Sequence, residues 1–207
     1  MGQRSASYND PAPNGSRPGV FQYTAAPEGM VKGRKSTIYH ETVPGHHYQI
    51  ALSLEDQTLP RFRRLGVFGF NSAHVEGWGL YAEKLAAENG WYEGDLAGEL
   101  DQLEQEIFRA RRLVVDTGMH AKHWTRQQAI DYGIAANEID RYVMMPGQAC
   151  SYMIGQLKYV ELRERARREL GGKFSVKAYH SFVLGLSVVP LDILEREVTR
   201  WIAEQRG

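Results

Sequence analysis

The sequence predicts a mainly α protein, with a short irregular leader at residues 1–35 and a helical domain at residues 36–207. Apolar residues recur at three- and four-residue steps in several segments after the leader, which is the spacing of one helix face. Proline and glycine separate these segments, as expected between helices. Only the leader contains a stretch with the composition of a strand.

The leader is predicted to be irregular because prolines and glycines occur throughout it. Residues 18–24 could form a short strand, since Val20 and Tyr23 favour β structure and turn residues flank them. So long an unstructured approach suggests that the segment packs against another part of the protein. As an edge strand it would pair with a peptide, and Tyr23 would line the cleft.

The helical domain is predicted to contain a series of helices divided by proline, glycine and capping residues. The first begins near Ser36, a suitable N-cap, and ends before Leu59-Pro60. Gly118 could interrupt the longest one. The predicted helices span residues 36–54, 72–89, 94–117, 126–136, 138–145, 148–170, 176–184 and 190–204.

Charge and hydropathy argue against several classes of protein. Twenty-five basic residues balance twenty-five acidic ones, whereas nucleic-acid binding usually requires a basic excess. No apolar run reaches the roughly 18 residues of a membrane span, and no signal peptide begins the chain. We therefore expect a soluble protein, cytoplasmic by default, with its compartment undetermined. A single cysteine, Cys150, excludes an intrachain disulfide and a cysteine-rich zinc ribbon.

The strongest chemical signal is the sequence HETVPGHH at residues 40–47. Zinc peptidases often place two histidines four residues apart on a helix, with a glutamate beside the first as general base. Here Pro44 takes the fourth position, and an ideal helix would carry His46 about 9 Å along its axis and onto another face. Pro44 and Gly45 favour a bulge that absorbs two residues and brings His46 into place. His47 is the alternative ligand; we favour His46.

A third metal ligand is expected from the segment HVEGWGLYAE at residues 74–83. Glu76 lies early on a predicted helix, and His74 is a weaker candidate. Gly77 and Gly79 would allow another backbone to approach closely. Glu83 shares the helix face of Glu76, so it could orient a ligating histidine.

Four segments in order carry a combined pattern: HETVPGHHYQI at 40–50, VEGWGLYAE at 75–83, RLVVDTGMH at 112–120 and YVMMPGQA at 142–149. Together they resemble the bacterial domain-of-unknown-function 885 family, whose members look like gluzincin-type zinc peptidases. The resemblance implies a multi-helix metallopeptidase-like fold with Zn²⁺ bound by His40, His46 and Glu76, and Glu41 as the general base. It covers about residue 14 to the C-terminus. Family members are usually much longer, so the chain matches their C-terminal catalytic part only.

Amide hydrolysis also needs a hydrogen-bond donor for the oxyanion. The candidates are His120, Tyr142 and Tyr152. Arg112 is preferred among three neighbouring arginines as a bidentate ligand for a substrate's terminal carboxylate. The competing interpretation is an arginine that is solvated or paired with glutamates of its own helix. We expect His123 and His180 to lie at the surface.

The sequence therefore predicts a zinc-dependent peptidase that acts on a peptide substrate and has neither a nucleic-acid partner nor a membrane span. Two other hypotheses remain. The chain could be a non-catalytic metal-binding fragment, or one half of a longer or split peptidase. It could also be a helical interaction scaffold with incidental histidines. Because such a cleft is expected to be shared between halves, an N-terminal half outside this chain or a second copy are the expected protein partners.

Overall fold

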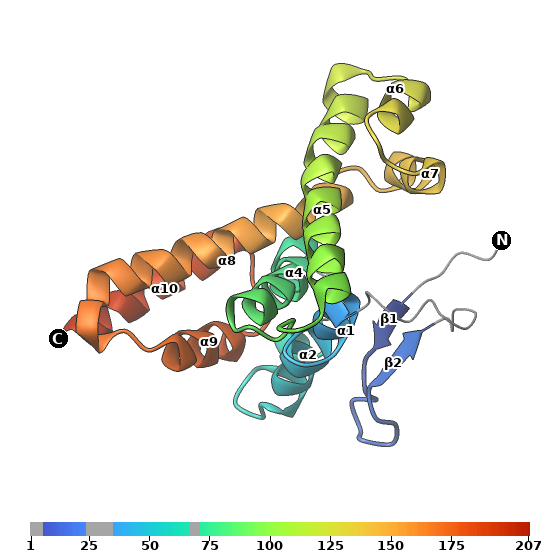
Figure 1. The fold of residues 1–207 in the computed structure, drawn as a ribbon. Coiled ribbons are helices and arrows are strands. Elements are labelled where there is room, and N and C mark those ends of the chain that lie inside the picture. The colour runs from blue at the N-terminus through green and yellow to red at the C-terminus, as the bar shows by residue number, and fades with distance from the viewer. Residues whose placement is uncertain (1–5, 24–34, 67–70) are drawn as a thin grey trace.

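The computed structural model describes residues 6–23, 35–66 and 71–207, and these ranges are mainly helical, as predicted (Figure 1). A two-stranded sheet precedes the helices. The elements are β1 (Ala6–Asn9), β2 (Val20–Tyr23), α1 (Lys35–Glu41), α2 (His46–Glu55), α3 (Arg61–Arg64), α4 (Ser72–Glu88), α5 (Leu96–Lys122), α6 (Arg126–Asp131), α7 (Ala136–Met144), α8 (Gln148–Leu170), the 3-10 helix η1 (Gly171–Lys173), α9 (Val176–Gly185) and α10 (Leu191–Arg206). No helix in the described ranges is both long enough and apolar enough to cross a membrane.

Helices α4 and α8 form the centre of the fold and pack closely along each other. Their backbones can approach because glycines meet where they cross. A Cβ atom on Gly77 would lie 2.4 Å from the Cα of Gly155, so the expected close backbone approach at Gly77 is confirmed. Trp78 and Tyr81 of α4 are buried there in one apolar cluster with residues of α8, α9 and α10. This packing fixes α4, which also contacts α1 and α2.

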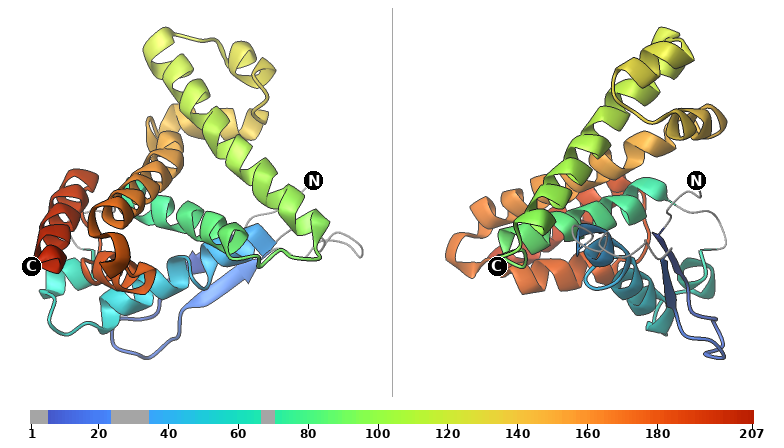
Figure 2. Two further views of the ribbon diagram at one scale, coloured as in Figure 1. Left: turned by 60° about the vertical axis from the view of Figure 1, so that its left-hand side comes forward. Right: turned by 45° about the vertical axis from the view of Figure 1, so that its right-hand side comes forward.

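The long helix α5 crosses α8 and extends away from the rest of the molecule, with α6 and α7 at its far end (Figures 1 and 2). Asp95 caps its start by accepting a hydrogen bond from the backbone N–H of Gly98 at 3.0 Å. The predicted interruption at Gly118 is wrong: α5 continues to Lys122 and ends at His123. A Cβ atom at Gly118 would lie 2.5 Å from Trp124, so the glycine provides space for that ring.

The leader contains a hairpin of which only the second strand was predicted. β2 lies within the expected 18–24 segment and pairs antiparallel with β1, in a register that places Ala6 opposite Tyr23. α1 begins at Lys35, next to the predicted boundary at 35/36, while the preceding residues 24–34 lie outside the described ranges. The short helix α3 was also not predicted.

The predicted helix 36–54 is two helices, which is the main correction to the expected fold. α1 ends at Glu41 and α2 begins at His46, so the chain breaks completely instead of forming a bulge. The Val43–Pro44 peptide bond is cis. Pro44 has no N–H to continue the helical hydrogen bonds. A Cβ atom at Gly45 would lie 1.8 Å from the carbonyl oxygen of His40, so α2 can start this close to α1 only from a glycine.

Candidate metal centre

Three side chains from separate helices converge where α1, α2 and α4 meet. His40 lies in the last turn of α1, His46 begins α2, and Glu76 lies near the start of α4. The Nε2 atom of each histidine is 3.3 Å from Oε2 of Glu76. The candidate ligand atoms of all three residues lie within 4.8 Å of one another. The two imidazole rings are nearly perpendicular, at 88°, with centroids 4.6 Å apart.

These distances and donor types fit a zinc ion. Zinc–nitrogen and zinc–oxygen bonds of about 2.0–2.2 Å in a tetrahedron place neighbouring ligand atoms about 3.3–3.5 Å apart. Both nitrogen–oxygen separations, 3.3 Å, agree with that geometry. Two imidazoles and a carboxylate form the ligand set of several catalytic zinc sites, which keep the fourth position open. We refer to His40, His46 and Glu76 as the triad.

A buried carboxylate holds His40 from the side opposite the triad. Nδ1 of His40 is 2.7 Å from Oε1 of Glu83, which is 1 % exposed. The Ser36 hydroxyl donates a hydrogen bond to Glu83, and Nη2 of Arg109 lies 3.8 Å from Oε1. Ser36 is therefore not the predicted N-cap but a buried residue within α1. A proton on Nδ1 leaves the Nε2 lone pair directed to the triad, so Glu83 occupies the orienting position predicted for it.

The electrostatics of the cluster favour a cation. Burial would lower the pKa of His40, but hydrogen bonds with Glu76 and Glu83 outweigh it and raise the pKa to about 9. Burial would raise the pKa of Glu76, but hydrogen bonds with His40 and His46 hold it below its ordinary value. The metal-free cluster thus keeps a proton on His40 between two carboxylates at neutral pH. A divalent ion would replace that proton and balance both carboxylates.

Space for the His40 ring is provided by Gly79. A Cβ atom at this position would lie 2.7 Å from both Nε2 and Cε1 of the imidazole. The close approach expected at Gly79 therefore exists, but it admits a side chain and not a backbone. Because Gly79 and Gly77 lie on the same helix, α4 contacts α8 through Gly77 and the His40 ring through Gly79.

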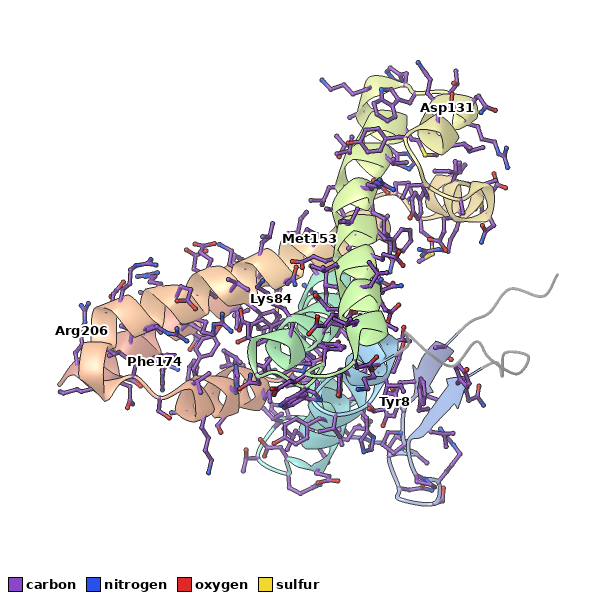
Figure 3. The ribbon with its side chains drawn as sticks, in the orientation of Figure 1. Tyr8, Lys84, Asp131, Met153, Phe174 and Arg206 are labelled. Atoms are coloured by element: carbon purple, nitrogen blue, oxygen red, sulfur yellow. The ribbon has the colours of Figure 1, made fainter. Side chains whose placement is uncertain are left out.

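The structure distinguishes between the two adjacent histidines. His47 is directed away from the triad, with Nδ1 2.9 Å from the hydroxyl of Tyr8 and its ring edge-on to the Tyr8 ring. Tyr8 lies on β1 of the hairpin, and its hydroxyl contacts α2 through His47 (Figure 3). His46 is thus the histidine that joins His40 and Glu76. Glu41, the predicted base, ends α1 directly after His40 and is half-buried.

Two further predicted residues, Tyr152 and Arg112, lie next to the triad. The ring of Tyr152 on α8 stacks on His40, with centroids 6.1 Å apart and planes at 24°. The guanidinium of Arg112 on α5 lies 4.1 Å from the centroid of the Tyr152 ring. Burial, together with Glu76, raises the pKa of Tyr152, so its hydroxyl stays protonated at neutral pH. Arg112 is 3 % exposed, so it is not a solvated surface arginine.

The remaining candidates lie elsewhere. His120 is exposed, and its Nε2 is 3.0 Å from the backbone oxygen of Tyr142. It lies about 12 Å further along α5 than Arg112. Tyr142 is buried in the apolar cluster at the far end of α5, with Arg112 5.4 Å from its ring centroid. Tyr23 lies on β2 and stacks on Phe21, and its role in substrate binding stays a prediction. Tyr152 is therefore the oxyanion candidate that the structure brings to the triad.

Burial lowers the pKa of two histidines outside the triad. His74, the weaker ligand candidate, is buried edge-on to Tyr159, and burial lowers its pKa to about 4. The expected surface position of His180 is wrong: it is half-buried, with Nε2 2.8 Å from the hydroxyl of Tyr81. Burial lowers its pKa to about 4 as well. His123 is exposed, as expected.

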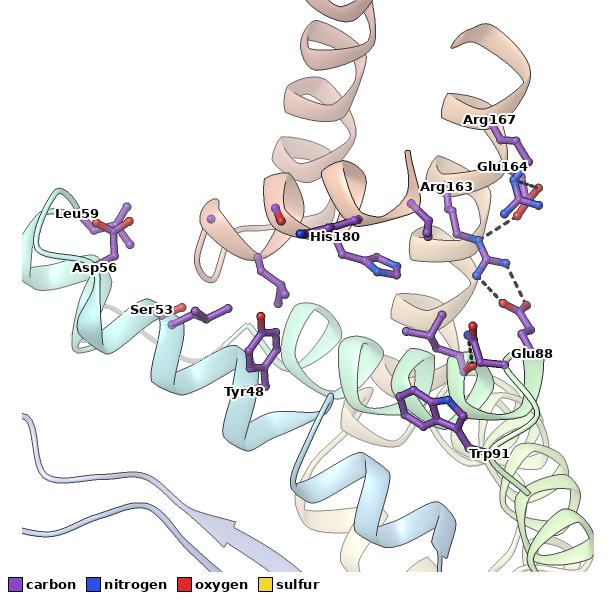
Figure 4. A pocket seen from close by; sticks show the side chains of 18 residues that line it. Tyr48, Ser53, Asp56, Leu59, Glu88, Trp91, Arg163, Glu164, Arg167 and His180 are labelled. Carbon is purple, nitrogen blue, oxygen red and sulfur yellow. Dashed lines mark hydrogen bonds and ion pairs between the residues drawn. The ribbon is translucent and has the colours of Figure 1, made fainter. Parts of the chain in front are cut away.

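A separate cleft of about 1120 Å³ lies between α2, α4, α8 and α9 (Figure 4). Its lining includes Tyr48 of α2, Trp91 and His180. On one side Arg163 donates two hydrogen bonds to Glu88, at 2.6 and 3.0 Å. Among the described residues that line the cleft there is no member of the triad, so the cleft and the triad are distinct features.

Solved structures of other proteins share this fold, and two of them are compared with it. The first is described as a "putative lipoprotein" from Colwellia psychrerythraea. It is 43% identical in sequence, with a TM-score of 0.90, and the match covers 98% of this chain and 36% of the Colwellia chain. The second is a similarly described protein from Shewanella oneidensis. It is 23% identical in sequence, with a TM-score of 0.73, and the match covers 92% of this chain and 38% of the Shewanella chain. The chain therefore spans little more than a third of either protein. No curated protein matches it.

A family model also covers nearly the whole chain. It matches residues 1–198 and is described as "Bacterial protein of unknown function (DUF885)". This match agrees with the resemblance seen in the four sequence segments, all of which lie within the matched range. The chain belongs to the DUF885 family.

Proposed function

We propose that this chain forms the zinc-binding part of a metal-dependent peptidase. The observation that carries the proposal is the convergence of His40, His46 and Glu76 from three helices, with Glu83 behind His40. Burying two carboxylates is unfavourable unless they are compensated. Incidental histidines on a scaffold would not explain why three helices and two glycines are arranged around this cluster.

The triad, its neighbouring side chains and Glu41, which follows His40 in the sequence, together offer the chemistry that peptide hydrolysis requires. Zinc bound by the triad would supply a Lewis acid that lowers the pKa of water and polarises a carbonyl group. Glu41 would accept the proton of the attacking water and return it to the leaving amine. Tyr152, protonated at neutral pH and stacked on His40, would donate a hydrogen bond to the developing oxyanion. Glu83 would keep His40 in the ligating tautomer.

The second candidate function is a metal-binding part that needs the remainder of a longer protein for turnover. The share of the solved relatives that the chain covers, 36% and 38%, supports this alternative. Both functions require zinc at the triad, and they differ in whether the chain by itself hydrolyses peptides.

The test compares Glu41→Gln with Glu55→Gln. Glu41 ends α1 and Glu55 ends α2, so the second variant is a matched control remote from the triad in sequence. We expect both variants to bind one zinc ion, measured by metal analysis after dialysis. Peptide-library hydrolysis should fall by about 10²- to 10⁴-fold in Glu41→Gln only.

Three outcomes would change the assignment. Full hydrolysis by Glu41→Gln would remove Glu41 as the base. Tightly bound zinc with no turnover in the unmodified chain would favour the second candidate function. Zinc binding that survives His40→Ala would refute the metal centre itself.

A further inference from the structure

Within the described ranges, the buried guanidinium of Arg112 is surrounded by aromatic rings and not by carboxylates in direct contact. Its side chain is 3 % exposed, and no carboxylate of the described residues forms an ion pair with it. Its Nε atom is buried, and has no hydrogen-bond partner in the part of the chain that the structure describes. Aromatic rings of Phe108, Tyr142 and Tyr152 surround it instead. Ring faces compensate a buried cation only in part, so the site favours an anion.

A neutral oxygen lies between Arg112 and a second arginine. Oε1 of Gln148 accepts a hydrogen bond from Nη1 of Arg141 at 2.9 Å and a longer one from Nη2 of Arg112 at 3.4 Å. An amide oxygen has no net charge and balances neither guanidinium. A carboxylate oxygen at the same point would accept charge-assisted hydrogen bonds from both, which are shorter and stronger. Gln148 also begins the 23-residue helix α8, whose N-terminus favours anions.

The nearby carboxylates are already engaged by other groups. Glu138 pairs directly with Arg141 at 2.8 Å and reaches Arg112 only through a longer-range charge interaction. Asp116 accepts a hydrogen bond from the backbone N–H of Gly147 at 3.0 Å. Access from solvent is provided on the Arg141 side, because that side chain is 35% exposed and Gln148 is half-buried.

One aromatic ring separates Arg112 from the triad. The guanidinium lies 4.1 Å from the centroid of Tyr152, and that centroid lies 6.1 Å from the centroid of His40. An extended peptide advances 3.3–3.6 Å per residue, so about three residues cover these two steps. A carboxylate held by Arg112 would therefore belong to a peptide whose reacting carbonyl lies within about three residues of it.

We propose that Arg112, Arg141 and Gln148 form a carboxylate subsite, and that the C-terminal carboxylate of a peptide substrate binds there. The inference rests on the proposed peptidase function and deepens it. It assigns the substrate class as peptides cleaved within about three residues of a free C-terminus. The same chemistry would accept an acidic side chain, so the test includes both sources of carboxylate.

The test is an NMR titration, up to millimolar concentrations, with three peptides and the metal-free 207-residue chain. The probes are N-acetyl-trialanine, its C-terminal amide, and an amide-capped analogue whose last residue is glutamate. Absence of metal ensures that no probe binds through the ion. We expect the free acid to bind about 10- to 100-fold more tightly than its amide, the gain typical of hydrogen bonds to a charged group. Tight binding of the glutamate probe instead would support the subsite but assign its carboxylate to a side chain.

Two variants at the rim avoid disturbing the buried Arg112. Arg141→Gln should reduce the affinity for the free acid to that for the amide, whereas Arg111→Gln, at an exposed arginine of α5, should not. Gln148→Glu places a resident carboxylate between the two guanidiniums. It should abolish the preference for the free acid and raise the Tm, while Gln205→Glu, at an exposed position of α10, should do neither.

The outcomes separate the subsite from the peptidase proposal. Equal affinity for all three probes, or binding of none of them, would overturn the subsite even if the zinc-loaded chain hydrolyses peptides. A clear preference for the acid that disappears in Arg141→Gln and Gln148→Glu would support the subsite even if no hydrolysis occurs. A Gln148→Glu variant with a lowered Tm and unchanged acid preference would also overturn it.

Discussion

Replacing Gly79 with alanine should weaken zinc binding while leaving the protein folded. The added Cβ atom would lie 2.7 Å from Nε2 and Cε1 of His40, and 3.0 Å from Cδ2. Favourable contacts between such atoms are about 3.5–4.0 Å, so the ring would have to retreat by about 1 Å. It cannot move freely, because Nδ1 is held 2.7 Å from Glu83.

A displacement of about 1 Å is several times the tolerance of about 0.2 Å for a metal–ligand bond. We therefore expect the Kd for zinc to rise by about 10- to 100-fold, as when an outer partner of a ligand is lost. This corresponds to about 1.4–2.7 kcal/mol. The free energy of unfolding of the metal-free protein should fall by less than this loss of zinc-binding free energy. Replacing a helical glycine with alanine stabilises the helix by about 0.5–1 kcal/mol, which offsets part of the overpacking strain.

Competition with a chromogenic chelator would measure the Kd for zinc, and thermal unfolding in chelator would measure the stability of the metal-free protein. Gly185→Ala is the matched control, since it lies in α9 and its Cβ would meet no described atom within 4 Å. An unchanged Kd in a Gly79→Ala protein of unchanged Tm would refute the reasoning, because the ring would then not depend on that space.

Three further predictions concern packing, orientation and pH. Gly77→Ala should destabilise the fold by about 1–3 kcal/mol in chemical denaturation, because its Cβ would lie 2.4 Å from the Cα of Gly155. An unchanged free energy of unfolding would contradict the close crossing of α4 and α8. Glu83→Gln should raise the Kd for zinc by about 10- to 100-fold. In the metal-free protein the same change should lower the pKa of His40 from its raised value of about 9, which NMR titration would detect. The pKa of His180 in the folded protein, about 4, lies below the ordinary value of 6.5, so its contribution to stability is complete above about pH 6.5 and is lost as the pH falls towards 4. The Tm of the metal-free protein should decline across that window, and His180→Gln should make the decline smaller, by on the order of 1 kcal/mol after allowing for partial exposure; an identical pH profile would count against a neutral His180.

Most of the helices could be predicted because their signals are local. Apolar periodicity and flanking glycine or proline identify α4, α8 and α10 within short windows of sequence. The strand β1 carries no comparable local signal, since it exists through pairing with β2. The Gly118 prediction failed because a glycine within a helix costs only about 1 kcal/mol, which packing against Trp124 can outweigh.

The candidate metal ligands could also be named from residue type and spacing, because a proline–glycine step between two histidines is visible in the chain itself. The sequence could not show which of the two adjacent imidazoles, His46 or His47, faces His40 and Glu76. That orientation depends on how α2 begins after Gly45, beside the carbonyl oxygen of His40. The roles of Tyr152 and Gln148 depend on contacts between residues far apart in the sequence: Tyr152 stacks on His40, and Gln148 joins Arg112. Those contacts follow from the placement of α1, α4, α5 and α8 against one another. That placement comes from long-range packing, such as the meeting of Gly77 with Gly155, which no local pattern specifies.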